Sequence, residues 1–186
     1  MDTKKDEKEF SNKCFKMVRE VSFDNLSKLT KMDSLRVEDF ELNGDLSYDH
    51  WIASITVLLG PAKIHTKAHF DSRAARELAA LASGKPGKGL PVAIMMDFMK
   101  EFLNMCMGDL KHTFSSKVEE VSIPQVEPTY DQATNVDKEN EAITRYWKIS
   151  WGNQSIILGC FIHVTGELKE LEETSGNPNV GKVEFL

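Results

Sequence analysis

The most informative segment of the chain reads Asp97-Phe-Met-Lys-Glu101-Phe-Leu-Asn104-Met-Cys-Met-Gly108-Asp-Leu-Lys111. At about 100° per residue, an α-helix over this segment gathers its polar residues within an arc of roughly 120°. That stripe consists of Asp97, Lys100, Glu101, Asn104, Gly108, Lys111, His112 and Ser115. The rest of the helix surface is apolar. The pattern therefore predicts a mostly buried helix with one exposed face.

The composition of this exposed face is unusual, because a solvated stripe is normally filled with interchangeable Lys and Glu. Here a carboxamide, Asn104, follows Glu101 by three residues, and Gly108 lies one turn further on. A second Glu-x-x-Asn occurs at Glu9 and Asn12, but only Glu101 also has a glycine seven residues later. Such a face would let another protein backbone come close.

The pattern D-x-x-x-E-x-x-N-x-x-x-G resembles the signature helix of the CheX/CheC/FliY family of chemotaxis phosphatases, and its single E-x-x-N helix is most similar to CheX. Upstream, residues 55–83 resemble the family's strand, glycine turn, strand and helix. Downstream, residues 121–126 resemble a short strand with proline, and residues 146–151 and 156–164 resemble a closing hairpin. Lys100 and Leu103 depart from the family, which usually has small residues there.

The resemblance implies an α/β fold of the α+β type, the CheC-like fold, with a largely antiparallel sheet packed against two long helices. It covers one domain over residues 10–165, between a loose start at 1–9 and an acidic tail at 166–186. It also implies a homodimer joined through sheet edges, and we expect strands at 145–151 and 156–163 to provide those edges.

For function, the resemblance implies a phosphatase acting on the aspartyl phosphate of a CheY-like response regulator. Glu101 and Asn104 are then the catalytic residues, and the partner-binding residues are Asp97, Lys100, Gly108 and Lys111. No metal or cofactor is expected on the chain itself, because the Mg²⁺ belongs to the regulator. The alternative is a non-catalytic module that binds response regulators or resembles a flagellar-switch component, a reading favoured by the bulky Leu103 and the charged Lys100.

The overall composition is that of an ordinary soluble domain, with 41% hydrophobic and 28% charged residues among 186. A net charge of −6 argues against nucleic acid as the main partner, since phosphate neutralisation needs a basic surface. An apolar run of about 18 residues, as a membrane span requires, does not occur. Cys14, Cys106 and Cys160 are far apart and have apolar neighbours, which favours reduced thiols and a cytoplasmic location.

Periodicity predicts the remaining elements. An amphipathic helix begins at Phe10, strands cover 37–42, 51–59 and 62–70, and a helix covers 72–83, ended by Gly84. Asn43-Gly44-Asp45 indicates a turn, and residues 127–141 indicate a long surface loop. The segment 84–89 is rich in glycine and lysine, but it lacks the phosphate-loop pattern and is interpreted as a connection.

Two histidines, His65 and His69, are four residues apart within the predicted strand at 62–70. On a strand they share a face but lie more than about 13 Å apart, too far to bind one metal ion without another element. We therefore expect solvated strand histidines.

Overall fold

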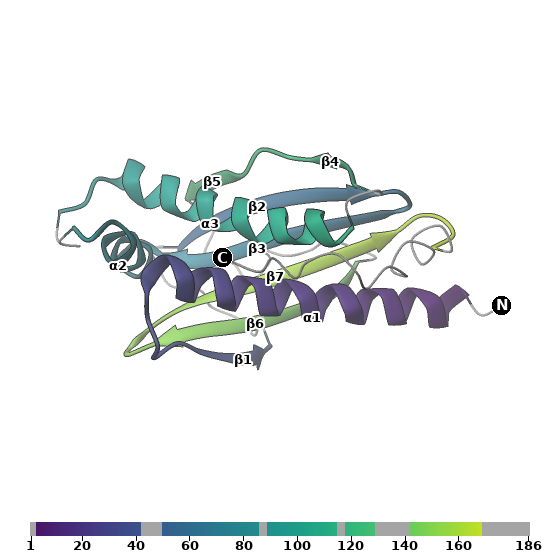
Figure 1. Cartoon of the computed structure of the whole chain (residues 1–186), viewed down its shortest axis with the longest axis horizontal. Coiled ribbons are helices and arrows are strands. Elements are labelled where there is room, and N and C mark those ends of the chain that lie inside the picture. The colour runs from purple at the N-terminus through teal and green to yellow at the C-terminus, as the bar shows by residue number, and fades with distance from the viewer. Residues whose placement is uncertain (1–2, 42–49, 86–88, 115–117, 129–141, 169–186) are drawn as a thin grey trace, which may run out of the picture.

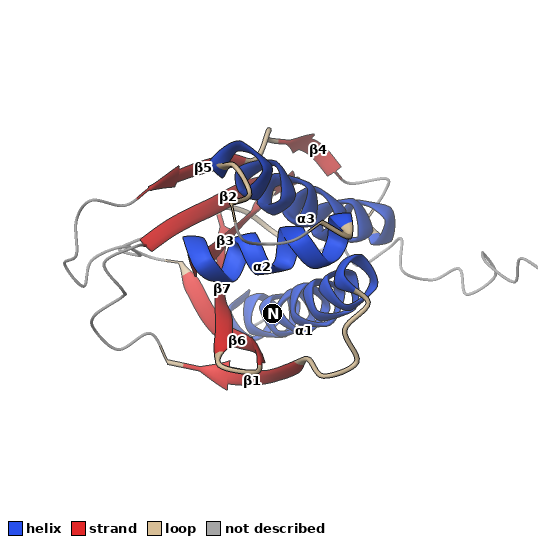
Figure 2. Ribbon diagram, turned by 90° about the vertical axis from the view of Figure 1, so that its left-hand side faces the viewer, coloured by secondary structure: helices blue, strands red, loops and turns tan. Residues whose placement is uncertain are grey.

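A computed structural model describes residues 3–41, 50–85, 89–114, 118–128 and 142–168. In these ranges one antiparallel sheet carries three helices on a single face (Figures 1 and 2). The helices are α1 (Thr3–Thr30), α2 (Ser72–Ser83) and α3 (Val92–Thr113). The strands are β1 (Arg36–Phe40), β2 (His50–Leu59), β3 (Ala62–Asp71), β4 (Val118–Val121), β5 (Gln125–Pro128), β6 (Ile143–Trp151) and β7 (Gln154–Val164). The expected α+β architecture is confirmed.

The sheet is built around two tight hairpins. Its order is β1-β6-β7-β3-β2-β4, with β5 also paired to β2. The turn between β2 and β3 uses Gly60 at φ 49°, and the turn between β6 and β7 uses Gly152 at φ 48°. Glycine suits both positions because a Cβ disfavours positive φ. Both hairpins were predicted from the sequence, and their strands extend slightly beyond the expected limits.

The core lies between the helix layer and the inner face of the sheet. Alternate strand residues point inward, as in β2, where Ala53, Ile55, Val57 and Leu59 are all buried. Buried tryptophans link the sheet to the helices. Trp147 Nε1 donates to Ser22 Oγ on α1 at 3.1 Å, and Trp151 Nε1 donates to Glu77 Oε1 on α2 at 3.0 Å. These bonds satisfy indole N–H groups that would be costly to bury alone.

Several element boundaries differ from the expectations. The loose start predicted for residues 1–9 is wrong from Thr3 onward, because α1 begins there and runs unbroken to Thr30. Leu168 is buried, so the packed chain continues past residue 165. The N–H of Thr165 donates a hydrogen bond to the Pro61 carbonyl at 2.8 Å, which holds this segment beside the turn between β2 and β3. The remainder of the predicted tail, from residue 169, lies outside the described residues.

The segment after α3 also differs from the prediction. Two short strands, β4 and β5, replace the single strand expected at 121–126, and both pair with β2. Between them the Ser122 N–H donates to the Thr56 carbonyl at 2.9 Å. The loop predicted for 127–141 is wrong at its start, because Glu127 and Pro128 belong to β5. Residues 129–141 and the turn at 43–45 lie outside the described residues.

The structure contradicts the expected edge strands. β6 is paired on both sides, by β1 and β7, and β7 is paired by β6 and β3. Among the described strands, β1 forms one edge of the sheet, and β4 and β5 lie at the other. Trp147 and Trp151 are covered by helices of the same chain rather than by a second copy. Pairing through free edges of β6 and β7 therefore no longer supports a homodimer. The homodimer stays a prediction, which a measurement of mass by light scattering tests.

The three cysteine thiols are buried in the core. Burial raises the pKa of the Cys14 thiol from 9.0 to about 12 and raises the pKa values of Cys106 and Cys160 as well. Above about pH 9 the unfolded chain therefore releases protons that the folded chain keeps. The free energy of unfolding should fall with rising pH, by about 1.4 kcal/mol per pH unit for each thiol.

Urea unfolding between pH 8 and 10.5 measures this slope, and Cys14→Ala is the matched variant because it removes one of the three thiols. The variant should lose stability more slowly above pH 9 than the unmodified chain. Parallel slopes for the two proteins would show that the Cys14 thiol titrates normally in the folded state.

Candidate functional site

The structure exposes the predicted stripe of α3. The exposed members are Asp97, Glu101, Asn104, Gly108, Lys111 and His112, whereas Lys100 is half-buried at the border of the stripe. Ser115 lies outside the described residues. The opposite side of the helix is fully buried and consists of Met95, Met99, Phe102, Leu103, Cys106, Met107 and Leu110. The sequence therefore predicted the rotation of this helix correctly.

The burial of Leu103 removes one of the two observations that favoured a non-catalytic module. Its side chain is 0% exposed and belongs to the core, so it does not obstruct the polar face beside Asn104. Helical geometry explains this placement, because residues i and i+2 lie about 200° apart around the axis and Leu103 therefore points away from Glu101. Only Lys100 remains as a departure that borders the face.

A polar contact with α1 fixes α3 in this orientation. The side chain of Asn25 is 2% exposed, and its Nδ2 donates to Asp109 Oδ2 at 2.9 Å. Because a buried amide is costly when unpaired, rotating α3 would break contacts that the core needs. The contact between Asn25 and Asp109 therefore keeps the polar stripe of α3 facing solvent.

Glu101 and Asn104 are accessible on this stripe. Neither side chain makes a hydrogen bond or ion pair with any part of the chain that the structure describes. The two residues are three apart on one helix, so their side chains are neighbours on its surface. A carboxylate and a carboxamide are therefore presented side by side to an approaching molecule.

Gly108 has no steric role within the described structure. A Cβ built at this position would meet no atom within 4 Å. Glycine inside a helix costs roughly 0.5–1 kcal/mol relative to alanine, so its presence in the middle of α3 is unfavourable for folding. The fold does not require a glycine here, whereas close approach by another backbone would.

The histidine expectation is wrong for His69. On the outer face of the sheet, His69 is only 2% exposed, and its Nδ1 lies 3.1 Å from Nε2 of His50. The strand register explains the contact, because His69 pairs with Ile52 and His50 is its diagonal neighbour. His65 is half-buried against Phe161. Within the described ranges, no cluster of three or more metal-ligating residues occurs.

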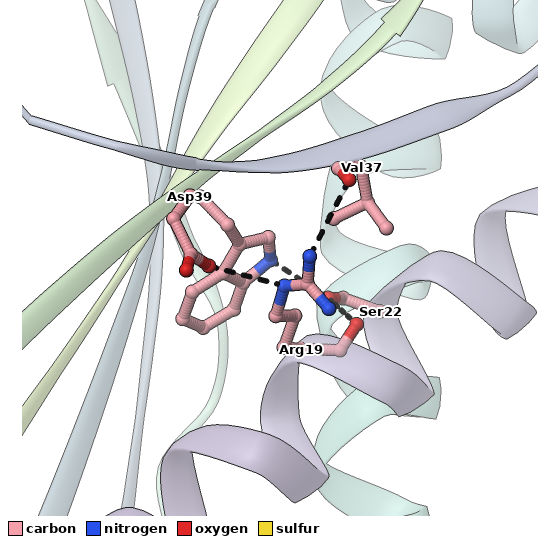
Figure 3. Close-up of polar contacts among 5 residues, drawn as sticks. Arg19, Ser22, Val37 and Asp39 are labelled. Atoms are coloured by element: carbon pink, nitrogen blue, oxygen red, sulfur yellow. Dashed lines mark hydrogen bonds and ion pairs between the residues drawn. The ribbon is translucent and has the colours of Figure 1, made fainter.

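Sequence reasoning missed two cationic features. One is a cleft of about 730 Å³ between α1, β1 and β6. There Arg19 Nε lies 3.4 Å from Asp39 Oδ1 and Arg19 Nη2 donates to the Val37 carbonyl (Figure 3). These groups come from α1 and β1, and no local pattern relates them. Because Arg19 is occupied in holding β1 to the helix layer, we assign it a structural role.

The second missed feature is a groove of about 910 Å³ along α2. Its cations are Arg73, Arg76 and Lys85. Arg73 and Arg76 are three residues apart on one helix, a spacing that could have indicated a shared face.

No membrane-spanning helix is found among the described helices.

Comparisons with known proteins find similarity in structure only. No protein-family model matches the sequence, and no curated protein sequence matches it. A chain of the CheX–CheY–BeF3–Mg²⁺ complex from Borrelia burgdorferi superposes with a TM-score of 0.64 at 10% identity, over 80% of this chain and 97% of that one. A chemotactic CheC-like protein from Shewanella oneidensis gives 0.63 at 13% identity, over 78% and 95%.

The chemotaxis protein CheX from Vibrio vulnificus gives a TM-score of 0.58 at 16% identity, over 83% of this chain and 99% of that one. All three superpositions include nearly the whole length of the solved protein. The resemblance expected from the α3 motif is thereby confirmed at the level of architecture: the chain has the CheC-like fold.

Proposed function

We propose that this chain is a CheX-like phosphatase that accelerates hydrolysis of the aspartyl phosphate on a CheY-like response regulator in the cytoplasm. The observation that carries the proposal is the exposed pair Glu101 and Asn104 on an otherwise buried helix. The fold supports it, and one structural neighbour was solved in complex with CheY.

Asn104 is proposed to orient the attacking water. Hydrolysis of an acyl phosphate needs a water molecule in line with the scissile P–O bond and little covalent help from the protein. The carboxamide oxygen can accept a hydrogen bond from that water, while its N–H group donates to a neighbouring oxygen. Asparagine also adds no negative charge beside the phosphoryl group, where aspartate would repel it.

Glu101 is proposed to anchor the regulator. Its carboxylate would pair with the lysine beside the aspartyl phosphate, forming a charge-assisted contact that fixes the helix in register. Asp97, Lys100 and Lys111 would contact the regulator around this pair. The Mg²⁺ of the reaction would belong to the regulator, in line with the neighbour whose complex contains CheY, BeF3 and Mg²⁺.

The decisive experiment is the rate of phosphate loss from candidate response regulators, each labelled on its aspartate, with and without this protein. Acceleration of one regulator at substoichiometric protein supports an enzyme. Binding without acceleration would instead support the non-catalytic module. Failure to bind or accelerate any regulator of the host would overturn both proposals.

Gly108 offers a test that separates docking from folding. Gly108→Ala should raise the free energy of unfolding by about 0.5–1 kcal/mol, because an added Cβ meets nothing in the fold and alanine favours helix. Gly108→Leu should also fold, yet its side chain would stand where the regulator approaches, and regulator binding should fall at least tenfold.

Urea unfolding measures the first effect, and titration of a regulator measures the second. Thr113→Leu, at an exposed position near the end of α3, is the control for a surface leucine on the same helix. Unchanged binding of Gly108→Leu would place the docking surface away from this stripe.

A further inference from the structure

The groove along α2 is unusual because it is basic in an acidic protein. The chain has a net charge of −6, yet the groove is lined by the cations Arg73, Arg76 and Lys85 and one carboxylate, Glu77. Glu77 is already engaged, since its Oε1 accepts the Trp151 indole hydrogen bond at 3.0 Å. None of the three cations forms an ion pair within the described parts of the chain.

The positions of these cations are not explained by the stability of α2. Arg73 lies in the first turn of the helix, which contains no acidic residue. A positive charge there faces the positive end of the helix dipole and costs a few tenths of a kcal/mol or more. Arg76 buries its Nε without a hydrogen-bond partner, a further cost to the folded chain. Lys85, just beyond the helix end, is the only one that the dipole favours.

Exposed apolar side chains gather at the same end of the helix layer. Leu81 in the last turns of α2 is 43% exposed, and Val92 and Ile94 in the first turn of α3 are 37% and 38% exposed. These are three of the five large apolar side chains exposed in the described part of the chain. Apolar groups beside cations are typical of a protein interface rather than of a site for a small inorganic anion.

The stripe on α3 leads toward this end. Ile94 precedes Glu101 by seven residues, two helical turns, and so lies on the same face of the helix as the proposed site. α3 follows α2 in the chain, and the two helices pack against each other (Figure 1). A protein docked on Glu101 and Asn104 would therefore extend naturally over the first turn of α3 toward α2.

We propose that the regulator's docking surface extends beyond the α3 stripe and places an acidic segment in the α2 groove, against Arg73, Arg76 and Lys85. Apolar side chains of the same partner pack on Leu81 and Ile94. This inference rests on the proposed function and adds a specificity determinant to it. Regulators are preferred when they carry a carboxylate-rich segment that reaches the α2 groove while the phosphorylated aspartate lies at Glu101 and Asn104. The groove binds the partner but takes no part in hydrolysis.

The test uses the full chain and a beryllofluoride-activated regulator chosen by the phosphatase screen. The double variant Arg73→Glu with Lys85→Glu reverses two exposed cations. Lys4→Glu with Lys8→Glu is the control, because it makes the same change in net charge near the start of α1, at the opposite end of the molecule from α2 (Figure 1).

At low salt the groove variant should bind the regulator at least tenfold more weakly than the unmodified chain, and the loss should shrink as salt rises. The control should change binding less than twofold. The hydrolysis rate at saturating regulator should stay unchanged in both. The conservative double variant, Arg73→Lys with Lys85→Arg, should bind the regulator as well as the unmodified chain does, because it keeps both positive charges.

The outcomes distinguish the two proposals. If the unmodified chain binds a regulator and the groove variant binds it equally well, the groove proposal is wrong and the proposed function stands. Equal weakening by the groove and control variants also overturns the groove, since net charge alone would explain it. If the unmodified chain binds no activated regulator, both proposals fail.

Discussion

Replacing Asn104 by alanine should lower the accelerated rate of regulator dephosphorylation by about 100-fold or more, to near the regulator's own rate. The proposed role of Asn104 is to hold one water molecule in line, and losing a positioned reactant typically costs this much. Binding of the regulator should change little, because Glu101 and Gly108 are untouched. The measurement is phosphate release at saturating regulator, together with the regulator's Kd.

The fold should survive this substitution. Asn104 is exposed and makes no hydrogen bond or ion pair among the described residues, and alanine has the higher helix propensity. Asn104→Asp, which keeps the shape but adds a charge, should be equally inactive. The chain also supplies a matched control in its second Glu-x-x-Asn, and Asn12→Ala on α1 should keep full activity. A folded Asn104→Ala protein with undiminished activity would remove this residue from the mechanism.

The exposed polar face of α3 could be predicted from the sequence because its information is local. The spacing of Asp97, Glu101, Asn104 and Gly108 along one helix determines that they share a face, whatever the rest of the fold does. The apolar residues between them determine which way that face points. The structure adds what sequence spacing does not contain, namely that an added Cβ at Gly108 meets no atom within 4 Å.

The features that were missed depend on contacts between distant segments. The family resemblance predicted β6 and β7 as a hairpin, but the residues of the hairpin do not say which strands flank it, and both strands proved to be interior. His69 was placed on the correct face of β3, yet its burial beside His50 depends on the register with β2. The Arg19 and Asp39 pair joins α1 to β1, and only the tertiary structure brings these residues together.

Changing Glu101 should affect docking far more than the chemical step. Glu101→Gln removes the charge but keeps the shape, and we expect regulator binding about tenfold weaker. Glu101→Lys places a cation against the regulator's lysine, and binding should weaken about 100-fold or more. Both losses should diminish at high salt, because the pair lies on an exposed surface where ions screen it. Titration of a beryllofluoride-activated regulator at two salt concentrations measures all three proteins.

The order of the three affinities distinguishes an ion pair from other roles of the carboxylate. If Glu101 only shaped the surface or held a water molecule, glutamine would bind as well as glutamate and salt would change nothing. If it acted in hydrolysis alone, all three proteins would bind equally and differ in rate. Glu9→Lys, at the exposed glutamate of the second Glu-x-x-Asn, makes the same charge change on α1 and should leave binding unaltered. Equal weakening by Glu9→Lys and Glu101→Lys would mean that overall charge, rather than a specific anchor on α3, governs association.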